Sequence, residues 1–201
     1  MPRKGYKLPV REGPGSHSGF YSFQYLLRAA CKVLEPKTAV EWGPGYSTEI
    51  LLENPETKVY SWENNIRYFN IVKNIFEKDE RSEINYVECP ELHPGKQEPY
   101  AMGPLLKFEP GTIDLCFVDG KDRASSLLAA YYLVSENGAV VVHDFNRHPF
   151  RLVDIKFPFI YRCGKANTGL LTKNEKVMDD ILKQYEITYP YGIFKPRDKT
   201  N

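Results

Sequence analysis

Four carboxylates in this sequence stand where short apolar runs finish, and acidic residues in such positions can act together on a ligand. They are Glu41, Glu63, Asp119 and Asp144. Carboxylates accept hydrogen bonds from sugar hydroxyls, attract positive charge, hold cations and take up protons. The neighbouring His143 can act as a base near neutral pH. The pattern predicts one polar site assembled from the ends of several strands.

A glycine-rich turn follows the first of these carboxylates. Gly43 and Gly45 flank Pro44, and a helical apolar pattern begins beside Ser47 and Thr48. Glycines let the backbone approach a ligand closely, and the N–H groups at the start of a helix point towards it. Either Ser47 or Thr48 can cap the helix. A strand, a glycine turn and a helix in this order are typical of nucleotide-binding proteins.

Glu63 lies about 20 positions after Gly43, a spacing at which a carboxylate can accept both ribose hydroxyls of a nucleoside. A dinucleotide-binding fingerprint would require a third glycine where Thr48 stands. Glu41, two places before the first glycine, instead suits a ligand with a positively charged amino-acid end. These features indicate a nucleoside ligand and disfavour a dinucleotide.

The elements that must position these residues alternate along the chain. Strands are predicted at 39–41, 58–62, 84–87, 113–118, 139–142, 159–163 and 168–172. Helices are predicted at about 23–34, 46–52, 64–76, 123–134 and 174–185. Ser18 or Ser22 is expected to cap the first helix, Asn137-Gly138 to stop the fourth, and Asn174 to cap the fifth.

This alternation predicts an α/β fold of the doubly wound, Rossmann-like type. The sheet is expected to be mostly parallel and seven-stranded, with helices on both faces and a C-terminal antiparallel hairpin. Ligands of such sheets bind outside the carboxyl ends of the strands, where the four carboxylates fall. We expect a flexible basic arm at 1–15, a single domain at 16–186 and a tail at 187–201. The proline-rich loop 90–111 is expected to be functional.

Two stretches resemble a known enzyme family. Residues 41–47 (EWGPGYS) resemble motif I, E-x-G-x-G-x-S, of the class I S-adenosylmethionine-dependent methyltransferases. The block 113–147 resembles the later motifs of the same family, with a D-x-x-F-V-D-G strand, a helix, and a V-V-V-x-D strand. The nearest pattern is that of catechol-type O-methyltransferases and their uncharacterised relatives, and the resemblance covers residues 36–147.

The resemblance implies S-adenosyl-L-methionine as the cofactor. The cofactor-binding residues would be Glu41, Gly43, Gly45, Ser47, Glu63, Glu88, Cys89 and Asp119. The catalytic candidates are Asp144, His143 and Asp119. Catechol-type enzymes also hold Mg²⁺ with two strand-end carboxylates and a following Asn, which would be Asp119, Asp144 and Asn146. The pattern departs from the family here, because Phe145 separates Asp144 from the Asn.

The resemblance implies O-methylation of a small molecule or a sugar hydroxyl by in-line methyl transfer. Two other classes stay open, namely an NAD-dependent oxidoreductase and a non-catalytic nucleoside-binding or interaction module on the same fold. The missing third glycine argues against the first of these, and the complete row of carboxylates argues against the second. The methyl acceptor is not encoded in a readable pattern.

The composition of the chain limits the classes of binding partner that we expect. The formal net charge is +1, so no overall field favours nucleic acid or a membrane surface. The four cysteines are scattered without a C-x-x-C pair, which gives no support for zinc or thioredoxin-like chemistry. No apolar stretch reaches the length of a membrane span, and the first residues lack a signal-peptide core. We expect a cytoplasmic protein with a small-molecule substrate, and its oligomeric state is open.

Overall fold

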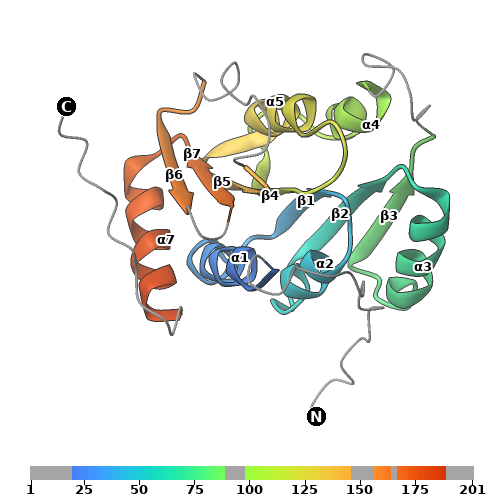
Figure 1. Ribbon diagram of the computed structural model, residues 1–201, viewed down its shortest axis with the longest axis horizontal. Coiled ribbons are helices and arrows are strands. Elements are labelled where there is room, and N and C mark those ends of the chain that lie inside the picture. The colour runs from blue at the N-terminus through green and yellow to red at the C-terminus, as the bar shows by residue number, and fades with distance from the viewer. Residues whose placement is uncertain (1–19, 89–97, 146–155, 164–166, 189–201) are drawn as a thin grey trace, which may run out of the picture.

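A seven-stranded sheet forms the centre of the molecule. The computed structural model describes residues 20–88, 98–145, 156–163 and 167–188. The strand order is β3-β2-β1-β4-β5-β7-β6 (Figure 1). The strands are β1 Thr38–Trp42, β2 Lys58–Glu63, β3 Ser82–Tyr86, β4 Ile113–Val118, β5 Val134–His143, β6 Phe159–Cys163 and β7 Thr168–Thr172. The first five are parallel, whereas β7 runs antiparallel to both β5 and β6. The predicted fold class is confirmed.

Helices cover both faces of this sheet (Figure 1). They are α1 Phe20–Leu34, α2 Tyr46–Leu51, α3 Ile66–Phe76, α4 Glu98–Met102, the 3-10 helix η1 Gly103–Leu106, α5 Arg123–Leu133 and α7 Glu175–Thr188. Helices α1, α2, α3 and α7 contribute to one apolar cluster, and α4 and α5 to the other. Successive residues of a strand point to opposite faces, so each central strand supplies both clusters. The sheet is therefore buried on both sides.

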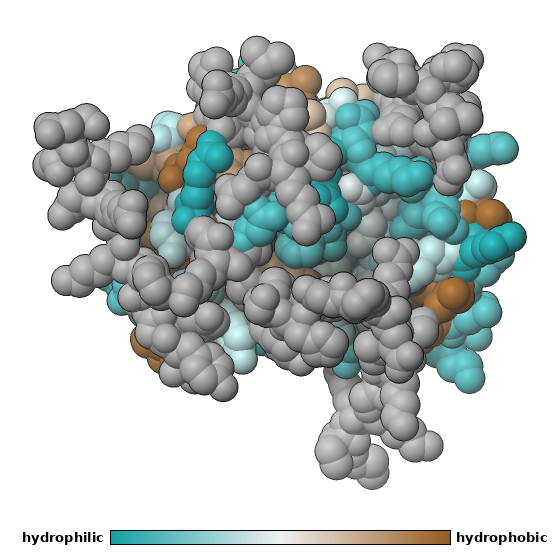
Figure 2. Space-filling model, viewed as in Figure 1, coloured by the Kyte–Doolittle hydropathy of each residue, from teal (hydrophilic) through white to brown (hydrophobic). Residues whose placement is uncertain are grey.

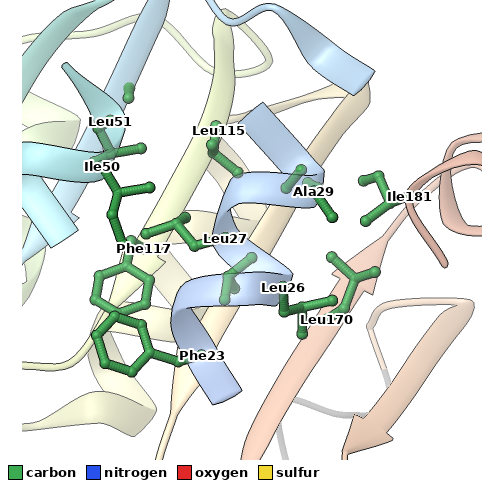
Figure 3. Packing of buried hydrophobic residues seen from close by; sticks show 14 of the residues in the cluster. Phe23, Leu26, Leu27, Ala29, Ile50, Leu51, Leu115, Phe117, Leu170 and Ile181 are labelled. Atoms are coloured by element: carbon green, nitrogen blue, oxygen red, sulfur yellow. The ribbon is translucent and has the colours of Figure 1, made fainter. Parts of the chain in front are cut away.

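Helix α1 is the centre of one of these two cores. Its side chains Phe23, Leu26 and Leu27 point at β4 and β7, where they meet Phe117 and Leu170 (Figure 3). These helical residues recur at spacings of three and four positions, which places them on one face of the helix. The helix thereby brings Phe23 to the ends of the central strands, next to the predicted site.

Several predicted boundaries are confirmed. The two hairpin strands begin and end where the sequence pattern places them. The Asn174 side chain accepts a hydrogen bond from the Lys176 N–H at the start of α7. Part of the proline-rich loop is helical, as α4 and η1. All of the predicted arm, most of the predicted tail and the segments 89–97 and 146–155 lie outside the described residues.

Other boundaries were predicted wrongly. Ser22 lies within α1 instead of before it, and Ser18, the other expected cap, lies outside the described residues. Helix α7 continues to Thr188, two residues into the predicted tail. Helix α5 ends at Leu133, and Asn137-Gly138 lies within β5 instead of stopping the helix.

The physical reason for the last error is a strand irregularity. Between Ile113 and Leu115 of β4, the partner residue on β5 moves from Val134 to Ala139. A Cβ atom on Gly138 would lie 2.6 Å from the carbonyl oxygen of Asp114. This glycine therefore allows a close approach of two strands, a role that sequence alone does not distinguish from a helix stop.

Among the described residues, the exposed large hydrophobic side chains are spread over α3, β3, η1, α5 and α7. They are Ile66, Ile71, Tyr86, Leu106, Tyr132 and Ile187. On the face shown in Figure 2, the coloured surface is mostly hydrophilic, with hydrophobic residues in small groups. Among the described residues, no helix combines the length and the apolar character that crossing a membrane requires.

Candidate functional site

The four strand ends that carry the predicted site lie side by side. In the parallel pairing, Trp42 of β1 is level with Trp62 of β2 and with Val118 of β4, and Val118 is level with Val142 of β5. The residues that follow these positions therefore leave the sheet along one edge. Glu63, Asp119 and the pair His143-Asp144 occupy that edge, where ligands of doubly wound sheets bind.

The turns after β1 and β4 pack directly against each other. Gly43 has a φ of 86°, and a Cβ atom there would lie 2.9 Å from the backbone of Gly120. The Gly43 N–H donates to the carbonyl of Trp62, and the Asp119 N–H donates to the carbonyl of Trp42. Any side chain at Gly43 would separate the two turns, so glycine is required on both conformational and steric grounds.

Helix α2 begins at this turn, but its cap differs from the prediction. The N-cap is Gly45, not Ser47 or Thr48. The Thr48 hydroxyl accepts a hydrogen bond from the Gly45 N–H at 2.9 Å. The hydroxyls of Ser47 and Thr48 both donate to the Glu41 carboxylate, so they link the start of α2 to β1.

Glu41 is completely buried beneath the turn. Its carboxylate accepts hydrogen bonds from the hydroxyls of Thr48 at 2.5 Å, Ser47 at 2.7 Å and Ser61 at 2.7 Å. Ser61 is its direct neighbour on β2. The carboxylate has hydrogen-bond donors but no cation among these partners. Direct contact with a ligand would require some of these hydrogen bonds to be exchanged.

Burial raises the pKa of the Glu41 carboxyl to about 7. Removal from water is the largest cause, because a charged carboxylate is costly to desolvate. The three hydroxyl hydrogen bonds favour the charged form and limit the rise in the pKa, whereas the negative charge of Asp119 adds to it. Glu41 and Asp119 are therefore close enough to influence each other electrostatically.

Glu63 is fixed at the end of β2. Its Oε1 atom accepts the N–H groups of Asn64 at 2.9 Å and Asn65 at 2.7 Å. Asn65 itself caps α3, with its side chain accepting the N–H groups of Arg67 and Tyr68. Two backbone donors thus set the orientation of the Glu63 carboxylate before any ligand arrives, which is a favourable arrangement for binding hydroxyl groups.

A charged cluster joins the ends of β4 and β5. The Arg123 guanidinium lies 2.9 Å from Asp119 Oδ1 through Nη2 and 3.1 Å from Asp144 Oδ2 through Nη1. Asn167, from the other side of β5, donates its side-chain amide to Asp144 Oδ1 at 3.1 Å. Asp144 has a φ of 57°, a left-handed conformation that is uncommon outside glycine and clusters at functional sites.

His143 completes this cluster. Its Nδ1 atom lies 2.9 Å from Asp119 Oδ1, and its ring packs against Phe23 of α1 with a centroid distance of 5.0 Å. A carboxylate partner favours the tautomer with hydrogen on Nδ1, which leaves Nε2 able to accept a proton. The pair therefore has the arrangement of a histidine base that is held by an acidic residue.

The residues present do not fit the divalent cation that the catechol-type pattern implies. One oxygen of each carboxylate that would serve as a ligand, Asp119 Oδ1 and Asp144 Oδ2, contacts the Arg123 guanidinium, and Asp144 Oδ1 accepts from Asn167. The third expected ligand, Asn146, lies outside the described residues. Across the part of the chain that the structure describes, no group of three or more His, Cys, Asp or Glu residues could hold a metal ion.

The predicted site residues thus divide by location. Gly43, Gly45, Ser47 and Glu63 surround the glycine turn and the end of β2, whereas Asp119, His143 and Asp144 form the cluster at β4 and β5. Glu88 is exposed beyond β3, and Cys89 lies outside the described residues. The roles of these residues in ligand binding stay predictions.

Sequence reasoning missed three participants. One is Arg123, although a cation four positions after Asp119 at a helix start is a usable signal. Another is Asn167, which lies directly before β7. Tyr100 gave no sequence signal. A Cβ atom on Gly120 would lie 1.8 Å from the hydroxyl oxygen of Tyr100, so the buried Tyr100 side chain lies directly against the turn after β4.

Comparison with known structures identifies the fold. The chain is similar to a methyltransferase-like protein from Silicibacter pomeroyi (TM-score 0.60, 18% identity, covering 85% of this chain and 95% of that one). It is also similar to an O-methyltransferase from Bacillus cereus in complex with SAH (0.58, 12%, 83% and 84%). Spermidine synthase from Thermotoga maritima matches at 0.52 and 15% identity, over 79% of this chain and 62% of that one. The chain has the class I methyltransferase fold.

At the level of sequence, the chain matches no protein-family model and no curated protein.

Proposed function

We propose that this protein is an S-adenosylmethionine-dependent methyltransferase that acts on a hydroxyl group of a small molecule. The observation that carries the proposal is the grouping of the glycine turn, Glu63 and the Asp119–His143 pair along one edge of a class I methyltransferase fold. The first two suit the adenosyl part of the cofactor, and the third suits the removal of a proton from an acceptor.

The chain's residues fit the cofactor at its nucleoside end. Gly43 and Gly120 keep the turns free of side chains, and the Glu63 carboxylate is oriented by two backbone N–H groups. Ribose hydroxyls are the groups that a strand-end carboxylate at this spacing accepts. The bound cofactor supplies an activated methyl group on a sulfonium ion, and its positive charge suits an edge that carries several carboxylates.

Proton removal is assigned to His143. Nε2 would accept the proton of the acceptor hydroxyl, while Asp119 holds the ring through Nδ1 and favours the positive charge that develops there. Phe23 fixes the plane of the ring by packing. Asp144 is held by Arg123 and Asn167 and borders the position of the acceptor.

Isothermal titration with S-adenosylmethionine tests the proposal. Wild type should bind with a dissociation constant in the micromolar range, about 1–100 μM. Glu63→Ala should weaken binding by at least about tenfold, since a hydrogen bond with a charged partner contributes about 1.5–3 kcal/mol. Glu63→Gln is the conservative comparison, because its amide oxygen can still accept the two backbone N–H groups.

Glu80→Ala is the matched control. Glu80 is an exposed carboxylate just before β3, at the opposite end of the parallel strands from Glu63. The Glu80→Ala substitution should leave the affinity for S-adenosylmethionine unchanged. If the wild type does not bind S-adenosylmethionine, the proposal is removed. Retention of NADH in preference to S-adenosylhomocysteine would also remove it and would favour the oxidoreductase alternative.

A further inference from the structure

The edge between β4 and β5 contains a cation that belongs to the chain itself. Arg123 bridges the two carboxylates that a divalent metal would need, at 2.9 Å from Asp119 and 3.1 Å from Asp144. A metal ion that used Asp119 Oδ1 or Asp144 Oδ2 would compete with the guanidinium for the same oxygen. It would also stand within a few ångströms of a like charge, where repulsion is strong at a partly buried site.

Arg123 is held in this position by more than its two ion pairs. Its Nε–H donates to the carbonyl of Gly120 at 3.1 Å, and Nη2 donates to the carbonyl of Asp119 at 3.1 Å. The side chain is only 14% exposed. It stands at the first residue of α5, directly after Asp122, whose φ of 48° turns the chain into the helix. A planar guanidinium with this many acceptors is well oriented, which a flexible surface arginine is not.

Among the contacts of the described residues, Arg123 supplies the positive charge shared by the two carboxylates. Asp119 and Asp144 supply two negative charges and Arg123 one positive charge, so the three groups together carry −1. Asp119 Oδ1 accepts from both Arg123 and His143. The guanidinium thereby fixes the oxygen that in turn orients the histidine ring.

We propose that Arg123 takes the place of the divalent cation at this edge and acts as the positioning residue for the Asp119–His143 pair. The chain therefore does not use Asp119 and Asp144 as metal ligands. The part played by His143 in methyl transfer rests on the proposed function, whereas the exclusion of the metal does not.

Mn²⁺ binding to the apo protein, followed by the electron paramagnetic resonance signal of the free ion, tests this inference. Wild type should bind no Mn²⁺ at this edge up to about 1 mM. Arg123→Met keeps the aliphatic stem but removes the charge, and should bind Mn²⁺ at least tenfold more tightly than wild type. Arg123→Lys retains a positive charge and should resemble wild type.

Two controls separate this effect from general ones. Arg81→Met removes a guanidinium that pairs with Asp79 elsewhere in the fold and should not create Mn²⁺ binding. Adding Asp144→Asn to Arg123→Met should abolish the binding that the single change creates.

Mn²⁺ binding by wild type that Asp119→Asn abolishes would overturn the inference, as would a folded Arg123→Met protein that binds no more Mn²⁺ than wild type. If Arg123→Met does not fold, the wild-type titration and its Asp119→Asn control still decide. No cofactor is present in this experiment, so its outcome is independent of the titration with S-adenosylmethionine.

Discussion

Two carboxylate centres lie close together in this molecule and are stabilised in opposite ways. Glu41 is fully buried and is satisfied by three neutral hydroxyls, with burial raising its pKa to about 7. Asp119 and Asp144 lie at the partly exposed edge and share the positive charge of Arg123. Both arrangements satisfy the hydrogen-bonding needs of carboxylates, but only the second supplies a counter-charge.

The difference indicates a division of labour. A buried carboxylate that is bonded to its own helix and to the next strand ties β1, α2 and β2 together, and so shapes the glycine turn. A charged cluster that includes a histidine can exchange protons with a bound molecule. Acidic residues from neighbouring strands can therefore have unlike roles, and the surroundings of each decide which role it has.

The largest expected effect concerns the edge cluster. His143→Ala should lower methyl transfer by about 10²–10⁴-fold, the usual contribution of a general base. Affinity for S-adenosylmethionine should stay within a few-fold of wild type, because the ring is held by Asp119 and Phe23, whereas the Glu63 carboxylate is the group that is assigned to the ribose. The measurement is formation of S-adenosylhomocysteine over a panel of phenols and sugars. Unchanged turnover in this variant would assign the proton transfer to another group.

A second prediction concerns the buried centre. The folded protein holds the Glu41 proton more tightly than the unfolded chain, so this group's stabilising contribution is complete below about pH 4.5 and is lost as pH rises through about 7. Glu41→Gln removes that dependence. The free energy of unfolding of the variant relative to wild type should therefore rise by up to about 3 kcal/mol between pH 4.5 and pH 7.5.

Urea unfolding across this pH range measures the difference, with Glu80→Gln on the exposed surface as the control. Turnover at a fixed pH should change much less in Glu41→Gln than in His143→Ala. A difference curve that is flat with pH, or a loss of turnover as large as that of His143→Ala, would remove the distinction between the two centres.

The smallest effect concerns the contact between the turns that adjoin the two centres. Gly43→Ala should destabilise the fold by about 1–3 kcal/mol, because it adds left-handed strain and a Cβ atom against Gly120. Gly111→Ala is a matched control, since Gly111 also has a positive φ, of 73°, but has no neighbouring atom within 4 Å of the added Cβ. Thermal unfolding should show the greater loss for Gly43→Ala. Equal losses would mean that backbone strain alone explains the glycine.

The architecture could be predicted from the sequence because the burial of strands and helices produces apolar repeats. These repeats extend over a few neighbouring positions, so they can be read without knowledge of tertiary contacts. The apolar run 113–118 and the two hairpin strands were placed correctly for this reason. The order of elements also placed the strand-end residues along one edge. Gly138 was misread because a helix stop and a strand irregularity both call for glycine.

The bonding within the site could not be read from the sequence in the same way. Glu41 was expected to face a ligand, but the hydroxyl of Ser61 on the neighbouring strand is among its partners, and that contact depends on strand register. Arg123 bridges two strand ends that are 25 residues apart in sequence, and Asn167 approaches from the hairpin. Such contacts depend on tertiary packing, and no motif of adjacent residues encodes them.

A crystal structure of the protein grown with saturating S-adenosylhomocysteine and millimolar Mn²⁺ tests the central claim most directly. The account predicts ribose hydroxyls within about 3 Å of the Glu63 carboxylate, with the Arg123 guanidinium still between Asp119 and Asp144. An adenosyl group bound away from Glu63, or a metal ion coordinated by Asp119 and Asp144 in place of Arg123, would contradict it.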